Sequence, residues 1–261
     1  MRHGGDGRHR VEAKSLLSQL LEPTERRQPT PGERLGFGAV PWGVLDVLVV
    51  TLLCLLVQVI LTPIGYVGYA RLASPTPDPA ALRFFLSAIT SYSLTLAIVW
   101  LLGVRRHRSS LAELGFRPLD LRGLVGFLAA LAVTVVGANV VLGLVAHVPR
   151  SQSLLDIGSG TIDIVLIGAL VVIAAPLAEE TLFRGYLLQG LAHRMPFWPA
   201  AVITSAVFAL AHVWWQLYVP IFVLGLAFAW LFWRTGSLWA PIAAHATINA
   251  TSLAVALLAL R

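Results

Sequence analysis

The sequence predicts an all-α fold, a polytopic bundle of about seven to eight transmembrane helices. Three observations lead to this prediction. Hydrophobic residues make up 57% of the chain and charged residues only 12%, which is too apolar for a soluble domain. Apolar runs of about 20 residues, the length that crosses a bilayer, alternate with short polar loops. Most of the tryptophans lie near the ends of these runs, as an aromatic belt at the membrane interface predicts.

Residues 1–40 form a polar tail with several prolines and charges. The first apolar run begins too late for a cleavable signal peptide, so we interpret the tail as cytoplasmic. Its apolar residues at helical spacing favour a short amphipathic helix on the membrane surface, with a disordered tail as the alternative. These residues are Val11, Leu16, Leu17, Leu20 and Leu21. Residues 41–261 are expected to form a single transmembrane domain.

Seven apolar runs follow the tail, and we interpret each as a membrane span. They cover residues 42–66, 82–104, 123–146, 162–191, 198–214, 217–233 and 238–260. Some of the runs are short. A further break would therefore give eight helices, and re-entrant segments are the alternative.

Basic residues predict the orientation of these spans. The loop after the second run carries Arg105, Arg106 and Arg108, and positive charge collects on the cytoplasmic side of a membrane. We therefore expect an integral cell-membrane protein with a cytoplasmic N-terminus. The net charge of +6 is explained by the bilayer, and nucleic acid is not expected as a partner. Lys14 is the only lysine among 19 basic residues, a bias typical of a GC-rich genome that favours a bacterial source.

Glu179, Glu180 and Arg184 place three ionisable side chains inside the run 162–191. Charges in hydrocarbon are costly unless they are paired or face water, so these residues indicate a functional site; a purely structural link between helices is the alternative. Glu180 and Arg184 are four residues apart, a spacing that predicts an ion pair on one helix face. Glu179 points about 100° away around the helix axis. It is the carboxylate left over, and it is a candidate general base.

Two later runs each carry a histidine in an i, i+4 pair. Phe208 and His212 share one face of the run 198–214, and His245 and Asn249 share one face of the run 238–260. Singly, a buried histidine is more often a packing residue than a catalyst. At a rise of about 1.5 Å per residue, however, both histidines and Asn249 reach depths similar to that of Glu179. Together they offer a base, an orienting partner and oxyanion donors for hydrolysis.

These residues also carry a family resemblance. Glu179-Glu180-x-x-x-Arg184, Phe208-x-x-x-His212 and His245-x-x-x-Asn249, in this order and within apolar runs, resemble the three motifs of the CPBP family of intramembrane endopeptidases. This family, also called Abi, includes the CaaX prenyl proteases and bacteriocin-processing or immunity proteins. The similarity covers a catalytic core at residues 162–250.

The resemblance implies a glutamate-dependent endopeptidase that hydrolyses peptide bonds of membrane-associated proteins or peptides. It implies that Glu179 activates the water with help from His212. It also implies that His245 and Asn249 stabilise the oxyanion. The supporting positions are Glu180, Arg184 and Phe208. The expected partners are a membrane-associated peptide or protein substrate and the lipid bilayer.

No cofactor is expected, although one carboxylate and two imidazoles could form a zinc site. Glu179, His212 and His245 would be its ligands, and a zinc-dependent peptidase is therefore an alternative. Arg184 opposes a dication nearby, no His-Glu-x-x-His run is present, and the only cysteine, Cys54, lies in another apolar run.

Two further alternatives are a non-catalytic immunity or scaffold protein and an ion transporter. A scaffold would use the same buried residues only to hold helices together. Buried carboxylates also mark ion paths, but a transporter should show inverted repeats. The sequence shows no internal repeat, which favours the peptidase.

Overall fold

A computed structural model of the chain describes residues 39–72, 80–119, 124–126, 128–131, 133–134, 160–212 and 215–259. These residues belong to one compact unit, Pro31–Arg261. Within them the backbone forms helices, turns and irregular segments and no strand, so the all-α prediction is confirmed for this part of the chain. The predicted tail helix lies outside the described residues, and so does most of the third predicted span, 123–146.

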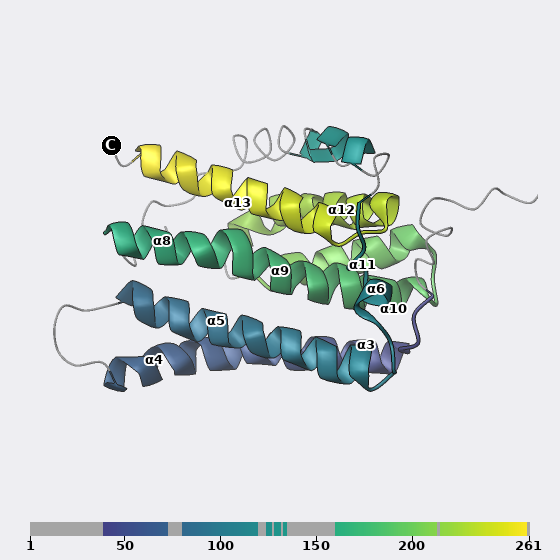
Figure 1. Ribbon diagram of the computed structural model, residues 1–261, viewed down its shortest axis with the longest axis horizontal. Helices are drawn as coiled ribbons and strands as arrows, with labels where there is room; N and C mark the ends of the chain where they lie inside the picture. The colour runs from purple at the N-terminus through teal and green to yellow at the C-terminus, as the bar shows by residue number, and fades with distance from the viewer. Residues whose placement is uncertain are drawn as a thin grey trace, which may run out of the picture. The chain divides into compact units, whose positions relative to one another are not determined.

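Four described helical rods are long and apolar enough to cross a membrane (Figure 1). They cover Val44–Gly68, Ala80–Arg105, Thr161–Ala192 and Trp215–Thr235, close to the first, second, fourth and sixth predicted spans. Two further helices are α11 (Phe197–Leu210), which is shorter, and α13 (Trp239–Ala259), which carries polar side chains. The count of seven to eight spans therefore stays a prediction.

Three of the four rods contain π-helical turns, which are rare and are frequently found at functional sites. The first rod consists of α3 (Val44–Leu56), η1 (Val57–Leu61) and α4 (Thr62–Leu72). The second consists of α5 (Ala80–Ile98) and η2 (Val99–Arg105). The third consists of α8 (Thr161–Ala169), η5 (Leu170–Ala174), α9 (Ala175–Glu180), η6 (Thr181–Leu188) and α10 (Gln189–Ala192). The acidic motif thus lies where α9 passes into the second π segment of the third rod.

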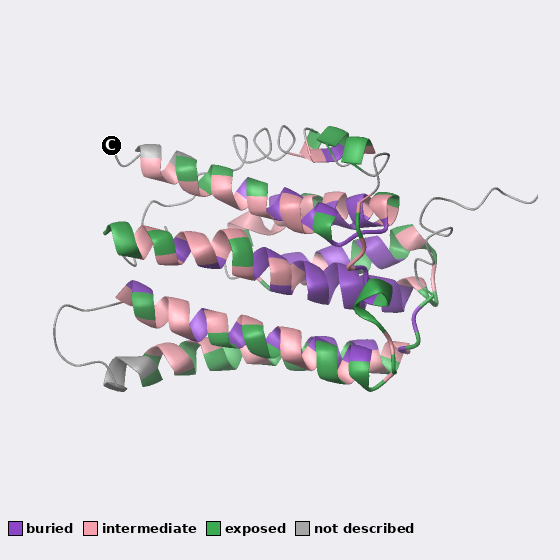
Figure 2. Cartoon of the chain, in the orientation of Figure 1, coloured by how far each residue is buried: buried purple, intermediate pink, exposed green. Residues whose placement is uncertain are grey.

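The third rod lies between α5 and α13 in the view of Figure 1. Its first half, α8 and η5, is largely exposed or half-buried, whereas every residue from Glu180 to Leu191 is buried (Figure 2). Exposed apolar side chains are expected where a membrane helix faces lipid. Glu179 therefore lies at the boundary between the accessible half of the rod and its fully enclosed half.

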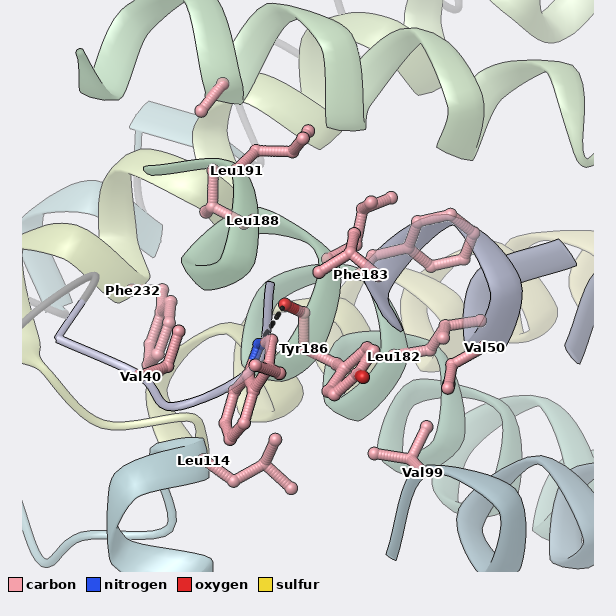
Figure 3. Close-up of a cluster of buried hydrophobic side chains, with 14 of the residues drawn as sticks. Val40, Val50, Val99, Leu114, Leu182, Phe183, Tyr186, Leu188, Leu191 and Phe232 are labelled. Carbon is pink, nitrogen blue, oxygen red and sulfur yellow. Dashed lines mark hydrogen bonds between the residues drawn. The ribbon is translucent and has the colours of Figure 1, made fainter. Parts of the chain in front are cut away.

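Tyr186 is the centre of a buried cluster that fixes the enclosed half (Figure 3). Trp42 stacks on the Tyr186 ring with centroids 5.0 Å apart, and its indole N–H donates to the Tyr186 carbonyl at 3.2 Å. Gln189 is also buried and donates to the Leu114 and Gly185 carbonyls at 3.0 and 2.8 Å. These contacts tie the start of the first rod and the short helix α6 (Leu111–Leu114) to the third rod, beside Arg184.

α6 (Leu111–Leu114) is a single turn that packs on this end of the third rod. The Glu113 carboxylate caps it by accepting from the Ser109 hydroxyl at 2.6 Å and from the Ser110 backbone N–H at 2.8 Å. These hydrogen bonds hold the pKa of Glu113 below its usual value, and the bond from Ser109 has the largest effect. Gly115 follows with φ of 115°, a conformation that favours glycine. Its carbonyl accepts from the Leu238 N–H at 2.8 Å, so α6 is also tied to the start of α13.

The fifth predicted span ends earlier than the sequence pattern indicates. We expected a run of 198–214 that contained His212, but α11 ends at Leu210 and His212 lies in the turn that follows. The backbone N–H of His212 donates to the Ala209 carbonyl at 3.1 Å. Its ring Nδ1 is hydrogen-bonded to the Phe208 carbonyl at 2.8 Å. The His212 side chain thus satisfies a carbonyl that a continuing helix would have used, and this ends the helix.

Candidate active site

Glu180 and Arg184 form a fully enclosed ion pair. Arg184 Nη1 donates to Glu180 Oε1 at 2.9 Å, and the side chains of Arg184 and Glu180 are 1% and 0% exposed, respectively. Arg184 Nη2 donates to the Gly225 carbonyl of α12 (Tyr218–Thr235) at 3.1 Å. The guanidinium also lies over the Phe208 ring, 4.4 Å from its centroid. The predicted i, i+4 pair is confirmed, and it connects the third rod to α11 and α12.

His245 of α13 lies between the two glutamates. Its Nδ1 is 3.0 Å from Glu180 Oε1, and its Nε2 is 3.9 Å from Glu179 Oε2. An ionised carboxylate only accepts hydrogen bonds, so Nδ1 is the donor to Glu180. The ring is stacked on Phe228 with centroids 5.1 Å apart. These contacts fix the orientation of the imidazole and direct its Nε2 towards Glu179.

Glu179 has surroundings that differ from those of Glu180. Its side chain is 20% exposed, and its two oxygens face different neighbours. Oε1 accepts a hydrogen bond from the Tyr92 hydroxyl of α5 at 3.1 Å, and Oε2 faces His245. The hydrogen bonds of Arg184 go to Glu180 and to the Gly225 carbonyl instead. The prediction that Glu179 is the carboxylate outside the arginine pair is confirmed.

Tyr92 is a site residue that our sequence reasoning missed. It lies 87 positions before Glu179 and belongs to none of the three motifs. The available signal was a series of hydroxyl side chains within one predicted span, which is unusual in an apolar helix. These residues are Ser87, Thr90, Ser91, Tyr92, Ser93 and Thr95.

His212 contacts Phe208, and the Phe208 ring in turn contacts His245. A carbonyl oxygen only accepts, so His212 Nδ1 is the donor in its hydrogen bond to the Phe208 carbonyl, and the neutral ring keeps Nε2 as an acceptor. The Phe208 ring lies 4.9 Å from the His212 ring and 6.0 Å from the His245 ring, between centroids. Both side chains are described, and neither a hydrogen bond nor an ion pair joins His212 to Glu179 directly.

Asn249 binds the third rod two turns before the glutamates. In η5 the Ala175 N–H bonds to the Leu170 carbonyl, five residues back. The next bond in this register would run from Pro176 to Val171, but proline has no N–H. Asn249 Nδ2 donates to the Val171 carbonyl at 2.7 Å and so supplies the missing donor. The amide nitrogen retains a second N–H.

The ligands of the zinc alternative, Glu179, His212 and His245, do not fit a metal site in this arrangement. In the part of the chain that the structure describes, no three His, Cys, Asp or Glu side chains are placed to hold one metal ion. The Nδ1 of His245 is used by Glu180, and Arg184 adds a positive charge 2.9 Å from that same carboxylate. A guanidinium so close to the carboxylates opposes binding of a dication.

Residues 161–251, which include all three motifs, match the protein family described as type II CAAX prenyl endopeptidase Rce1-like. A Bacillus subtilis (strain 168) protein named "Putative membrane peptidase YdiL" is 26% identical over 129 residues. That similarity covers 48% of this chain and 52% of the relative, so the chain spans about half the length of that protein. An Escherichia coli protein named "Uncharacterized 24.3 kDa protein" is 31% identical over 178 residues, which is 66% of this chain and 78% of the relative. No solved structure matches the chain significantly.

Proposed function

The chain belongs to the CPBP family, and on this basis we propose that it is a glutamate-dependent intramembrane endopeptidase. Its proposed substrates are membrane-associated proteins or peptides, cut near the cytoplasmic face of the bilayer. One observation carries the proposal. Glu179 is a partly accessible carboxylate held by Tyr92 and facing His245, whereas its neighbour Glu180 is fully buried and paired with Arg184.

In the proposed reaction Glu179 takes a proton from a water molecule, and the hydroxide attacks the carbonyl carbon of the peptide bond. Only an accessible carboxylate can receive that water, which selects Glu179 over Glu180. His212 assists by accepting a hydrogen bond at Nε2, the nitrogen that its bond to the Phe208 carbonyl leaves available. The proton held by Glu179 then passes to the leaving amine as the C–N bond breaks.

The tetrahedral intermediate carries a negative oxygen that needs donors. His245 supplies an Nε2–H when its ring is protonated, and the second N–H of Asn249 supplies another. Glu180 accepts from His245 Nδ1 and is itself held by Arg184. This chain of contacts keeps the imidazole in one orientation, so its donor needs no rearrangement during the reaction.

We further propose seven to eight spans in a bacterial cell membrane, with the N-terminus in the cytoplasm. The arginines at the end of the second rod, Arg105, Arg106 and Arg108, support this orientation. It places the enclosed half of the third rod, Glu180 to Leu191, on the cytoplasmic side of Glu179. Cleavage near the cytoplasmic face follows from that placement.

Glu179→Gln tests the proposal because it keeps the shape of the side chain and removes the base. The measurement compares cleaved termini in membrane proteomes of cells that express the wild-type protein or the variant at equal levels. We expect the termini produced by the wild-type protein to fall by about 100-fold to 10,000-fold. Glu113→Gln is the matched control, since Glu113 is exposed on α6, and its termini should equal those of the wild type.

The same comparison separates the alternatives. A scaffold or immunity protein would leave the set of termini unchanged in Glu179→Gln cells, and that result would contradict the proposal. A further experiment treats wild-type membranes with a strong chelator and tests whether cleavage depends on a metal. We expect cleavage to continue, because Glu179, His212 and His245 are not arranged as ligands of one metal; loss of cleavage that added zinc restores would favour a zinc enzyme.

A further inference from the structure

Tyr92 reaches the proposed active site from the second rod. α5 lies outside the family match, which covers residues 161–251. Its Tyr92 hydroxyl nevertheless donates to Glu179 Oε1 at 3.1 Å, while Glu179 Oε2 lies 3.9 Å from His245 Nε2. The carboxylate is therefore held at one oxygen by the second rod and faces α13 with the other.

Polar contacts with the first rod fix the rotation of α5. Thr62 donates to the Ser91 hydroxyl at 2.8 Å, and Gln58 donates to the Thr95 hydroxyl at 3.1 Å. Ser91 and Thr95 are one turn apart, so this face of α5 is held against the first rod. Tyr92 follows Ser91 and points about 100° away around the axis. That direction leads to the third rod, and the hydroxyl meets Glu179 there.

From this geometry we propose that Tyr92 is a positioning residue for the general base. A carboxylate on a rotatable side chain can present either oxygen to water or to a neighbour. The Tyr92 hydroxyl occupies Oε1 and leaves Oε2, on the His245 side, for the attacking water. Tyr92 acts through Glu179 and does not touch the peptide bond. This inference rests on the proposed peptidase function.

Tyr92→Phe tests the inference, because it removes one oxygen and keeps the ring in its packing. The substrate is a synthetic peptide that spans a cleavage site defined by the Glu179-dependent termini, and purified variants cleave it in detergent. We expect kcat to fall about tenfold while KM stays within about twofold and the unfolding midpoint is unchanged. Tyr218→Phe, at the start of α12, is the matched control and should behave as wild type.

Three outcomes would overturn the inference. An unchanged kcat in Tyr92→Phe would show that the hydrogen bond does not position the base. A rise in KM together with a lower unfolding midpoint would show that Tyr92 only packs helices. Glu179→Gln is measured in parallel. If Glu179→Gln remains active, the proposed base and Tyr92 both fail, whereas an inactive Glu179→Gln beside a fully active Tyr92→Phe refutes the role of Tyr92 alone.

Discussion

Glu179 and Glu180 are neighbours in the chain, but their carboxylates lie in two different regions of the molecule. The Glu180 region is closed: its side chain is 0% exposed and contacts Arg184 and His245. The Glu179 region is partly exposed: the Glu179 side chain is 20% exposed and accepts a hydrogen bond from the neutral hydroxyl of Tyr92. One step along a helix turns the side chain by about 100°, which is enough to separate a paired carboxylate from a partly accessible one.

The difference shows how one helix can place two adjacent acids in different surroundings. A buried charge pair is stable only while both partners are present and hydrogen-bonded. Arg184 donates to its partner Glu180 and to the Gly225 carbonyl. The pair then holds His245 for its accessible neighbour. In our proposal, the structural role and the chemical role are thus divided between two consecutive residues.

The largest expected effect comes from applying one substitution to both regions. Glu180→Gln leaves the Arg184 charge uncompensated in an enclosed site, and we expect a loss of about 3–5 kcal/mol in the free energy of unfolding. Glu179→Gln should change that free energy little, because Arg184 keeps its partner Glu180 and the glutamine oxygen can still accept from Tyr92. Thermal unfolding of the two purified variants in detergent measures the contrast. Equal losses in both variants would contradict the division between the two regions.

Arg184→Lys sharpens the comparison within the closed region. Lysine keeps the charge beside Glu180 but lacks the planar fork that also reaches the Gly225 carbonyl and stacks on Phe208. We expect a loss of about 1.5–3 kcal/mol, the range for a hydrogen bond to a charged group and smaller than the loss in Glu180→Gln. Denaturant or thermal unfolding provides the measurement. Wild-type stability in Arg184→Lys would show that the charge alone stabilises this region.

Local spacing in the sequence predicts part of this comparison. The Glu180 to Arg184 pair follows from i, i+4 geometry, and the separation of Glu179 follows from the same helix period. The four long rods also follow from runs of apolar residues. These features depend only on neighbours along one helix, and for that reason a single sequence is enough to predict them.

Other features depend on contacts between helices, which spacing within one helix does not contain. The hydrogen bond from Tyr92 to Glu179 joins two rods. The direction of the Tyr92 side chain depends on the rotation of α5 against the first rod. The end of α11 before His212 reflects competition between a ring nitrogen and a backbone N–H for the Phe208 carbonyl. The donor that replaces the missing N–H of Pro176 likewise comes from another helix, because Asn249 of α13 supplies it to the Val171 carbonyl.

The smallest expected loss of stability concerns Asn249. One N–H of its amide donates to the Val171 carbonyl of the third rod, and in our proposal the other N–H stabilises the oxyanion. Asn249→Ala leaves the Val171 carbonyl without its donor, and we expect a loss of about 1–3 kcal/mol. The loss of the second N–H should lower kcat by about 100-fold. Stability and kcat are measured on the same purified preparations.

Pro176→Ala separates these two effects, because alanine restores a backbone N–H beside the Val171 carbonyl. In the double variant Asn249→Ala, Pro176→Ala we expect stability to return towards that of Pro176→Ala alone while kcat stays low. Only the backbone carbonyl, and not the oxyanion, gains a donor from the second substitution. Recovery of kcat in the double variant would mean that Asn249 works by completing the helix at Pro176, and the oxyanion would then depend on His245.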